Sequence, residues 1–131
     1  MITRGVVLNP TDLSFSDWPA RAKEAGLTTI ALHHSREVSH VSDFMQREEG
    51  QAFLATCREL GLEVEYELHA MKDLLPRDLF DKEKSLFRMA DDGERVPDFN
   101  LCVHSERALQ IAAENAVAIS RLLRPTTGRY F

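Results

Sequence analysis

The sequence predicts an α/β fold built on a parallel sheet, and three observations lead to this expectation. Short apolar runs alternate three times with segments of helical periodicity. No two apolar runs are joined by a two-residue hairpin turn, and strand–helix–strand units with parallel strands are the usual outcome of such an alternation. The third run, 63–70, alternates ionisable and apolar residues, which places a row of polar side chains on one face of a strand.

The elements of the first half follow from their start and stop signals. Ser16 or Asp17 can cap the first helix, and Gly26 and Gly61 can end the first and second helices, because glycine adopts the left-handed conformation that closes a helix. The expected order is strand 5–10, helix 17–25, strand 28–34, a helix capped by Ser42 or Asp43 that runs to about Leu60, and strand 63–70.

The second half begins with a long excursion over 72–104, rich in prolines and charges. Residues 74–80 are expected to add a short helix, and 91–95 a turn between two short extended pieces. Ser105 caps a last helix. Its apolar stripe is expected to contain Ala108, Ile111, Ala112, Ile119 and Leu122. Residues 128–131 have the pattern of the beginning of a fourth strand.

A barrel-type arrangement is favoured over an open sheet. The polar row of 63–70 suits a barrel interior, whereas a central strand of an open sheet is usually apolar on both faces. We therefore expect residues 1–131 to form a single domain of three to four strand–helix units. A complete (β/α)8 barrel needs roughly 250 residues, so the prediction is a partial TIM-type barrel.

Composition excludes several classes of function. The formal net charge is −5 and Lys and Arg are not clustered, which argues against nucleic acid or an anionic membrane as partner. No apolar run approaches the roughly 20 residues of a membrane span, and no signal peptide is recognisable, so a cytoplasmic location is expected. Glycine-rich nucleotide-binding motifs are absent, Cys57 and Cys102 form no zinc pattern, and no cofactor or metal is expected.

The candidate site residues lie where predicted strands end, because barrel enzymes build their sites at the carboxyl ends of the strands. Glu67 and His69 are two apart on one strand face, and substrate contact, a purely structural pair and metal ligation remain open for them. Glu67 is also the only candidate for a general acid, and the catalytic residue is otherwise unknown. The candidate substrate-binding residues are His69, Glu67, His33, Glu65, Asn9, Asp73 and Arg77.

Three segments carry a resemblance to a known family. Glu65 or Glu67 is followed by His69 at the end of a strand, segment 100–106 leads into a helix through a Ser-Glu cap, and 129–131 begins another strand. These segments resemble the (β/α)8 glycoside hydrolases of the hexosaminidase type and their uncharacterised glycosidase-like relatives. The resemblance implies the N-terminal half of such a barrel, with the acidic pair of the family lying beyond Phe131.

The function implied is a carbohydrate-active barrel fragment that contributes sugar-binding residues to an incomplete glycosidic-bond hydrolase site. Its expected partners are a small-molecule carbohydrate and the remainder of the barrel. Two alternatives remain: a metal-dependent sugar isomerase-like barrel with Glu67, His69 and His33 as ligands, and a non-catalytic half barrel that pairs as a homodimer. The second is physically reasonable because a half barrel leaves a strand edge and an apolar sheet face uncovered.

Overall fold

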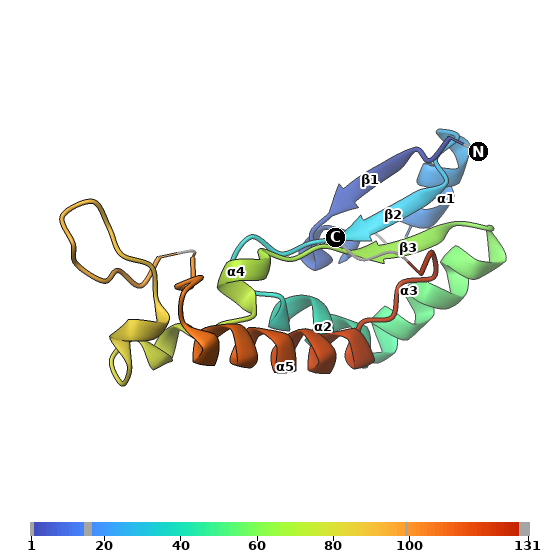
Figure 1. Cartoon of the computed structure of the whole chain (residues 1–131). Helices are drawn as coiled ribbons and strands as arrows, with labels where there is room; N and C mark the ends of the chain where they lie inside the picture. Colours follow the sequence, from blue (N-terminus) through green and yellow to red (C-terminus); the bar gives the residue numbers. More distant parts are fainter. Residues whose placement is uncertain (1, 15–16, 99, 129–131) are drawn as a thin grey trace. The chain divides into compact units, whose positions relative to one another are not determined.

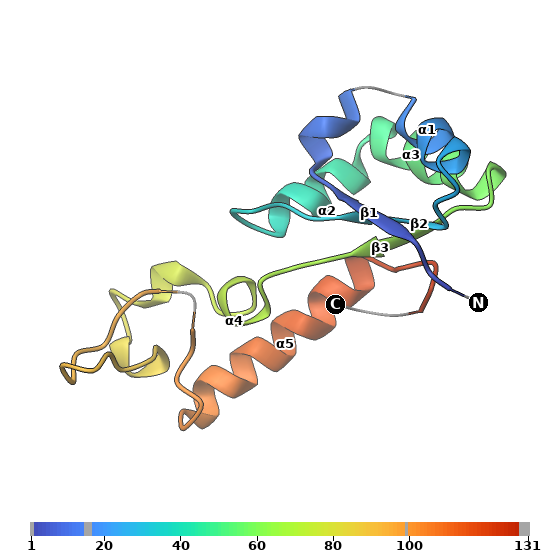
Figure 2. The same ribbon diagram turned by 90° about the horizontal axis from the view of Figure 1, so that it is seen from above.

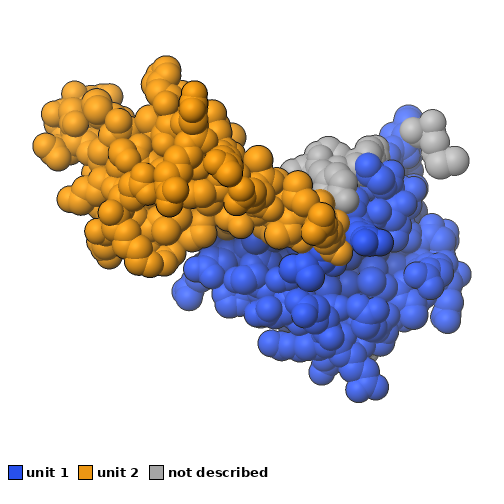
Figure 3. Space-filling view, turned by 60° about the horizontal axis from the view of Figure 1, so that its bottom comes forward, with its two compact units in different colours: residues 1–68, 122–131 blue, residues 69–121 orange. Residues whose placement is uncertain are grey.

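The computed structural model describes residues 2–14, 17–98 and 100–128, and the chain divides into two compact units. Unit 1 contains Met1–Leu68 and Leu122–Phe131, and unit 2 contains His69–Arg121 (Figure 3). Unit 1 is therefore discontinuous in sequence, and unit 2 is one continuous insertion in it. The expectation of a single domain over 1–131 stays a prediction.

Unit 1 is built on a three-stranded parallel sheet with the order β1-β2-β3 (Figure 1). Its strands are β1 (Gly5–Leu8), β2 (Thr29–Leu32) and β3 (Glu63–Tyr66). The predicted α/β class with parallel strands is confirmed. The finer prediction, a partial TIM-type barrel, stays a prediction.

The helices of unit 1 lie on one side of this sheet (Figure 2). After the 3-10 helix η1 (Pro10–Ser14), they are α1 (Trp18–Glu24), α2 (Ser39–Gln46) and α3 (Glu48–Glu59). The prediction of one helix from Ser42 or Asp43 to Leu60 is wrong. The helix begins earlier and is broken at Arg47, whose backbone is extended (φ −83°, ψ 164°), and the bend brings the start of α3 against the end of α2.

The two faces of the sheet differ in chemistry. Ile30 and Leu32 of β2 pair in register with Val64 and Tyr66 of β3 and are all buried. This face packs against the helices, α3 among them. Burial there, and next the neighbouring Cys57 of α3, raises the pKa of Tyr66 to about 12. The opposite face carries Val7, Thr29, Ala31 and Glu65.

The outer edge of β3 is bonded by a distant segment. Thr126 donates its backbone N–H to the Val64 carbonyl oxygen (2.9 Å), and its Oγ1 accepts from the Val64 N–H (2.8 Å). Part of the edge that would otherwise be open is thereby paired. The fourth strand expected at 128–131 falls mostly on 129–131, which lie outside the described residues.

The predicted third strand is too long. It ends at Tyr66 rather than Ala70, and the chain enters α4 (Ala70–Asp73) four residues later. The row of four ionisable residues on one strand face is therefore shorter than predicted, with only Glu63 and Glu65 in β3.

Unit 2 is more compact than the loop excursion predicted over 72–104. After α4 come the 3-10 helices η2 (Arg77–Leu79) and η3 (Lys84–Leu86) and two antiparallel bridges, Phe87 with Leu101 and Met89 with Arg95. These bridges flank the turn predicted at 91–95. The hydrophobic core of unit 2 consists of Leu75, Leu86, Phe87, Leu101 and Ala108.

The last helix, α5 (Glu106–Leu122), begins where the sequence predicts. Ser105 accepts the N–H of Ala108 on its hydroxyl (3.2 Å), which is the expected N-terminal cap. One member of the predicted stripe is wrong: Leu122 is 58% exposed, whereas Leu123 is 2% exposed. None of the described helices is both long enough and apolar enough to cross a membrane.

Candidate functional site

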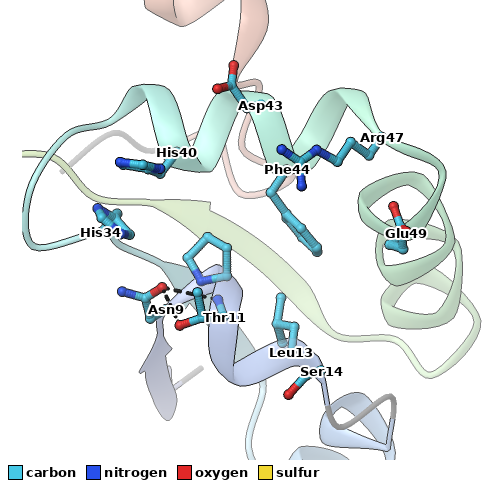
Figure 4. Close-up of a pocket in the computed structure, with 11 residues that line it drawn as sticks. Asn9, Thr11, Leu13, Ser14, His34, His40, Asp43, Phe44, Arg47 and Glu49 are labelled. Carbon is cyan, nitrogen blue, oxygen red and sulfur yellow. Dashed lines mark hydrogen bonds between the residues drawn. The ribbon is translucent and has the colours of Figure 1, made fainter.

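A pocket of about 390 Å³ lies in unit 1, beside the carboxyl ends of β1 and β2 (Figure 4). The residues that line it follow β1, follow β2, or belong to α2 and the beginning of α3. They are Asn9, Pro10, Thr11, Leu13, Ser14, His34, His40, Asp43, Phe44, Arg47 and Glu49. This is the end of a parallel sheet at which α/β proteins usually bind ligands.

Asn9 shapes the pocket by fixing the turn after β1. Its Oδ1 accepts hydrogen bonds from the backbone N–H (3.1 Å) and the hydroxyl (2.9 Å) of Thr11, and its own N–H donates to Asp12 Oδ2 (2.9 Å). An asparagine suits this position because its side chain replaces a backbone partner in a tight turn. With Oδ1 engaged by the turn, the side-chain amide nitrogen is the group that can donate to a ligand.

His34 follows β2 and is held by its own loop. Its Nδ1 accepts from the backbone N–H groups of Arg36 (3.2 Å) and Glu37 (3.4 Å), which assigns the proton of the neutral ring to Nε2. Its ring centroid lies 4.0 Å from that of His40. Desolvation, then the neighbouring His40, lowers the pKa of His34, so at neutral pH the ring is an uncharged Nε2–H donor.

Phe44 supplies an apolar wall. Its ring points into the pocket towards Leu13, and the Asp43 carboxylate points away from it (Figure 4). Phe44 meets Phe53 of α3 in an edge-to-face contact with ring centroids 6.4 Å apart, which holds the ring in position. Arg47 and Glu49 add a cation and an anion at the pocket's margin. The pocket thus combines donors, acceptors and an aromatic face.

Of the predicted site residues, Asn9 alone is among those that line this pocket. His33 follows β2 directly, and its N–H donates to the Leu8 carbonyl oxygen (3.0 Å). Glu65 is 7% exposed and pairs with Ala31 in the sheet. Glu67 continues the ladder by one hydrogen bond, from its N–H to the Leu32 carbonyl oxygen (3.0 Å).

His69 and Asp73 have a local role in unit 2. The His69 N–H donates to Asp73 Oδ2 (2.9 Å), which caps the first turn of α4. The prediction that Glu67 and His69 share a strand face is wrong, because both residues follow the end of β3.

Arg77 is occupied by backbone acceptors within unit 2. Its guanidinium donates to the carbonyl oxygens of Leu75, Met71 and Asp98 and lies over the Phe87 ring, 4.7 Å from the centroid. Burial lowers its pKa. These contacts give Arg77 a clear structural role, whereas substrate binding by it stays a prediction.

A metal site finds no support in the described part of the chain. There, no group of three or more His, Cys, Asp or Glu side chains is placed to hold a metal ion.

Comparison with known proteins adds no relative. No family model matches the chain, and no curated protein and no solved structure is significantly similar to it. The interpretation of the site therefore rests on its own geometry and chemistry.

Sequence reasoning missed most of the pocket. It singled out Asn9, which lines the pocket, and His33, which does not, and it overlooked His34, His40 and Phe44. The sequence did indicate the position of His34. Side chains alternate along a strand, so His34 lies on the same face as Ile30 and Leu32, which is the face covered by the helices. The contribution of α2 had no comparable signal, because its helix was predicted to begin after His40.

Proposed function

We propose that this chain binds a small carbohydrate in the pocket formed by Asn9, His34 and Phe44, within a partial glycosidase-like barrel. The observation that carries the proposal is an aromatic ring facing a pocket with hydrogen-bonding groups at the carboxyl end of a parallel sheet. Sugars suit such a pocket because their hydroxyl groups need donors and acceptors, while their C–H face packs on an aromatic ring.

The partial barrel is supported by the division of the sheet into two faces. In a barrel, one face of each strand meets the outer helices and the other lines the interior. β2 and β3 direct Ile30 and Val64 to the helices and Ala31 and Glu65 to the other face, where both side chains are buried. A buried carboxylate on the second face is in keeping with a barrel interior.

Binding, rather than hydrolysis, is the function that the pocket supports. A glycosidase needs two carboxyl groups placed across the scissile bond. Glu67, the candidate general acid, is not among the residues that line the pocket. The carboxylates that do line it belong to Asp43 and Glu49, and in Figure 4 Asp43 points away from the pocket, so among the described lining residues Glu49 has no second carboxylate opposite it. We therefore assign sugar recognition to this chain and leave the acid of a hydrolytic site to the remainder of a barrel.

Saturation-transfer NMR with glucose and N-acetylglucosamine tests the proposal. In Asn9→Asp the turn acceptor Oδ1 is kept while the amide donor is replaced by an acceptor. His34→Asn likewise keeps an acceptor for the loop while removing the Nε2–H donor. Each substitution is expected to weaken binding about tenfold, the value of one hydrogen bond of roughly 1.4 kcal/mol.

His104→Asn is the matched control, because His104 is exposed in unit 2. Its affinity for the sugar is expected to equal that of the parent protein. A parent protein that shows no saturation transfer from either sugar, or a His34→Asn variant that binds as well as the parent, contradicts the proposal.

A further inference from the structure

A second pocket in unit 1, of about 410 Å³, lies between the end of α3, β3 and the segment that follows α5. Its lining residues are Leu54, Cys57, Arg58, Gly61, Leu62, Glu63, Val64, Arg124 and Thr126. None of them belongs to the carbohydrate pocket. Arg58 comes from the last turn of α3, and Arg124 comes from a part of the chain that is 66 positions further on (124 − 58).

The floor of this pocket is apolar and uncharged. Leu54 is half-buried, and Leu62 and Val64 are buried. Burial raises the pKa of the Cys57 thiol to about 12, so the thiol stays protonated at neutral pH and adds no negative charge. Glu63 is the one carboxylate among the lining residues, against two guanidinium groups.

No contact within the described part of the chain explains why positions 58 and 124 are arginines. Among the described residues, neither Arg58 nor Arg124 forms an ion pair or a side-chain hydrogen bond. An arginine in the last turn of a helix often satisfies its free carbonyl groups.

At the end of α3, however, backbone N–H groups already bond the free carbonyl groups. The carbonyl oxygens of Thr56, Arg58 and Cys57 accept from Leu60 (3.0 Å), Gly61 (3.1 Å) and Leu62 (2.8 Å), respectively. Gly61 makes this closure possible with its positive φ of 65°. The guanidinium groups are thus available for a ligand.

We propose that this pocket binds a small organic anion, whose carboxylate or phosphate group pairs with Arg58 and Arg124 and whose apolar body lies on Leu54 and the edge of Leu62. Guanidinium groups suit both oxyanions because their planar fork donates two parallel hydrogen bonds. Recognition of an apolar body requires the floor as well as the cations, so inorganic anions alone are poor ligands.

Isothermal titration of the full chain with benzoate, phenyl phosphate, benzyl alcohol, acetate and inorganic phosphate tests this site. Benzoate or phenyl phosphate is expected to bind saturably, and whichever binds more tightly identifies the oxyanion. Benzyl alcohol, acetate and inorganic phosphate are each expected to bind at least tenfold more weakly, because each lacks either the charge or the apolar body.

Arg58→Gln and Arg124→Gln are expected to weaken the binding of the aromatic anion about tenfold each, and Arg58→Lys less than Arg58→Gln. Arg21→Gln is the matched control, since Arg21 is an exposed arginine of α1 outside the pocket, and its affinity is expected to stay unchanged. Equal affinity for benzyl alcohol and benzoate, or equal losses in Arg21→Gln and Arg58→Gln, overturns the proposal. Glucose and N-acetylglucosamine are not expected to compete with the aromatic anion, because the two pockets share no lining residue. The two binding proposals can therefore be tested independently.

Discussion

Gly50 and Phe44 are in direct backbone contact across the junction of α2 and α3. A Cβ atom added at Gly50 would overlap the carbonyl oxygen of Phe44 and lie 2.7 Å from the Cα atom of Met45. Only glycine fits here, although Gly50 lies near the start of α3, inside a helix. The position of the Phe44 ring in the pocket beside Asn9 and His34 therefore depends on a glycine that does not line this pocket.

Gly50→Ala is expected to destabilise the protein by about 3 kcal/mol, because backbone atoms rather than flexible side chains must move. Urea denaturation measures the loss. Gly5→Ala is the matched control, since its added Cβ would be 3.4 Å from the nearest atom, the carbonyl oxygen of Thr29. It is expected to change stability by less than about 1 kcal/mol. Equal losses for the two variants contradict the tight α2–α3 junction.

Protonation of His34 is expected to destabilise the fold. Desolvation, His40 and Arg36 lower its pKa from the ordinary value of 6.5, so the unfolded chain binds the proton more readily than the folded one. The free energy of unfolding therefore rises with pH between the lowered pKa of the folded state and 6.5, the value of the unfolded chain. Below the folded-state pKa, the destabilisation is complete. The free energy of unfolding measured between pH 5 and pH 7 is expected to vary less in His34→Asn than in the parent. A lowered pKa in the histidine NMR titration is the direct check.

The two cysteines are expected to differ in reactivity. Hydrogen bonding from Arg95, and next from the backbone N–H of His104, lowers the pKa of Cys102, whereas burial raises the pKa of Cys57 to about 12. Because the thiolate is the nucleophile, iodoacetamide at pH 8 is expected to modify Cys102 first, as mass spectrometry of the peptides can show. Arg95→Gln is expected to slow this modification and His104→Gln to leave it unchanged, since the backbone N–H remains. Faster labelling of Cys57 refutes this assignment.

Arg77→Lys is expected to cost about 1–3 kcal/mol of stability in unit 2. Lysine keeps the charge but loses the fork that reaches the carbonyl oxygens of Leu75 and Asp98, leaving partly buried acceptors without their donor. Hydrogen exchange of the amides of unit 2 reports the loss. In the control Arg107→Lys, an exposed ion pair with Glu83 is altered, and the expected effect is below about 1 kcal/mol. Similar exchange rates in both variants argue against a structural role for Arg77.

The sequence predicts those features of the fold that local chemistry determines. Gly26 and Gly61 end their helices with φ values of 74° and 65°, and Ser105 caps α5, as expected from residue type alone. The break at Arg47 brings Gly50 into close contact with Phe44, and the spacing of apolar residues does not predict it. Alternation likewise continues to His69, although β3 ends at Tyr66 and the last ladder hydrogen bond comes from the Glu67 N–H. A side-chain pattern does not report which backbone groups have partners.

The candidate site is less predictable than the fold for the same reason. Asn9 could be found because it ends a strand, and an Asn-Pro pair marks a turn. His40 and Phe44 belong to a helix that only the folded chain brings opposite the turn after β1. A pocket assembled from such distant segments is a property of tertiary packing.

The pairing of Thr126 with Val64 also sets an order of events during synthesis. The two residues are 62 positions apart, and a ribosome adds about 5–20 residues each second. The outer edge of β3 therefore emerges roughly 3–12 s before the residue that covers it. During that interval the nascent chain exposes the unpaired N–H and C=O groups of this edge to other chains, and an exposed strand edge is a route to aggregation.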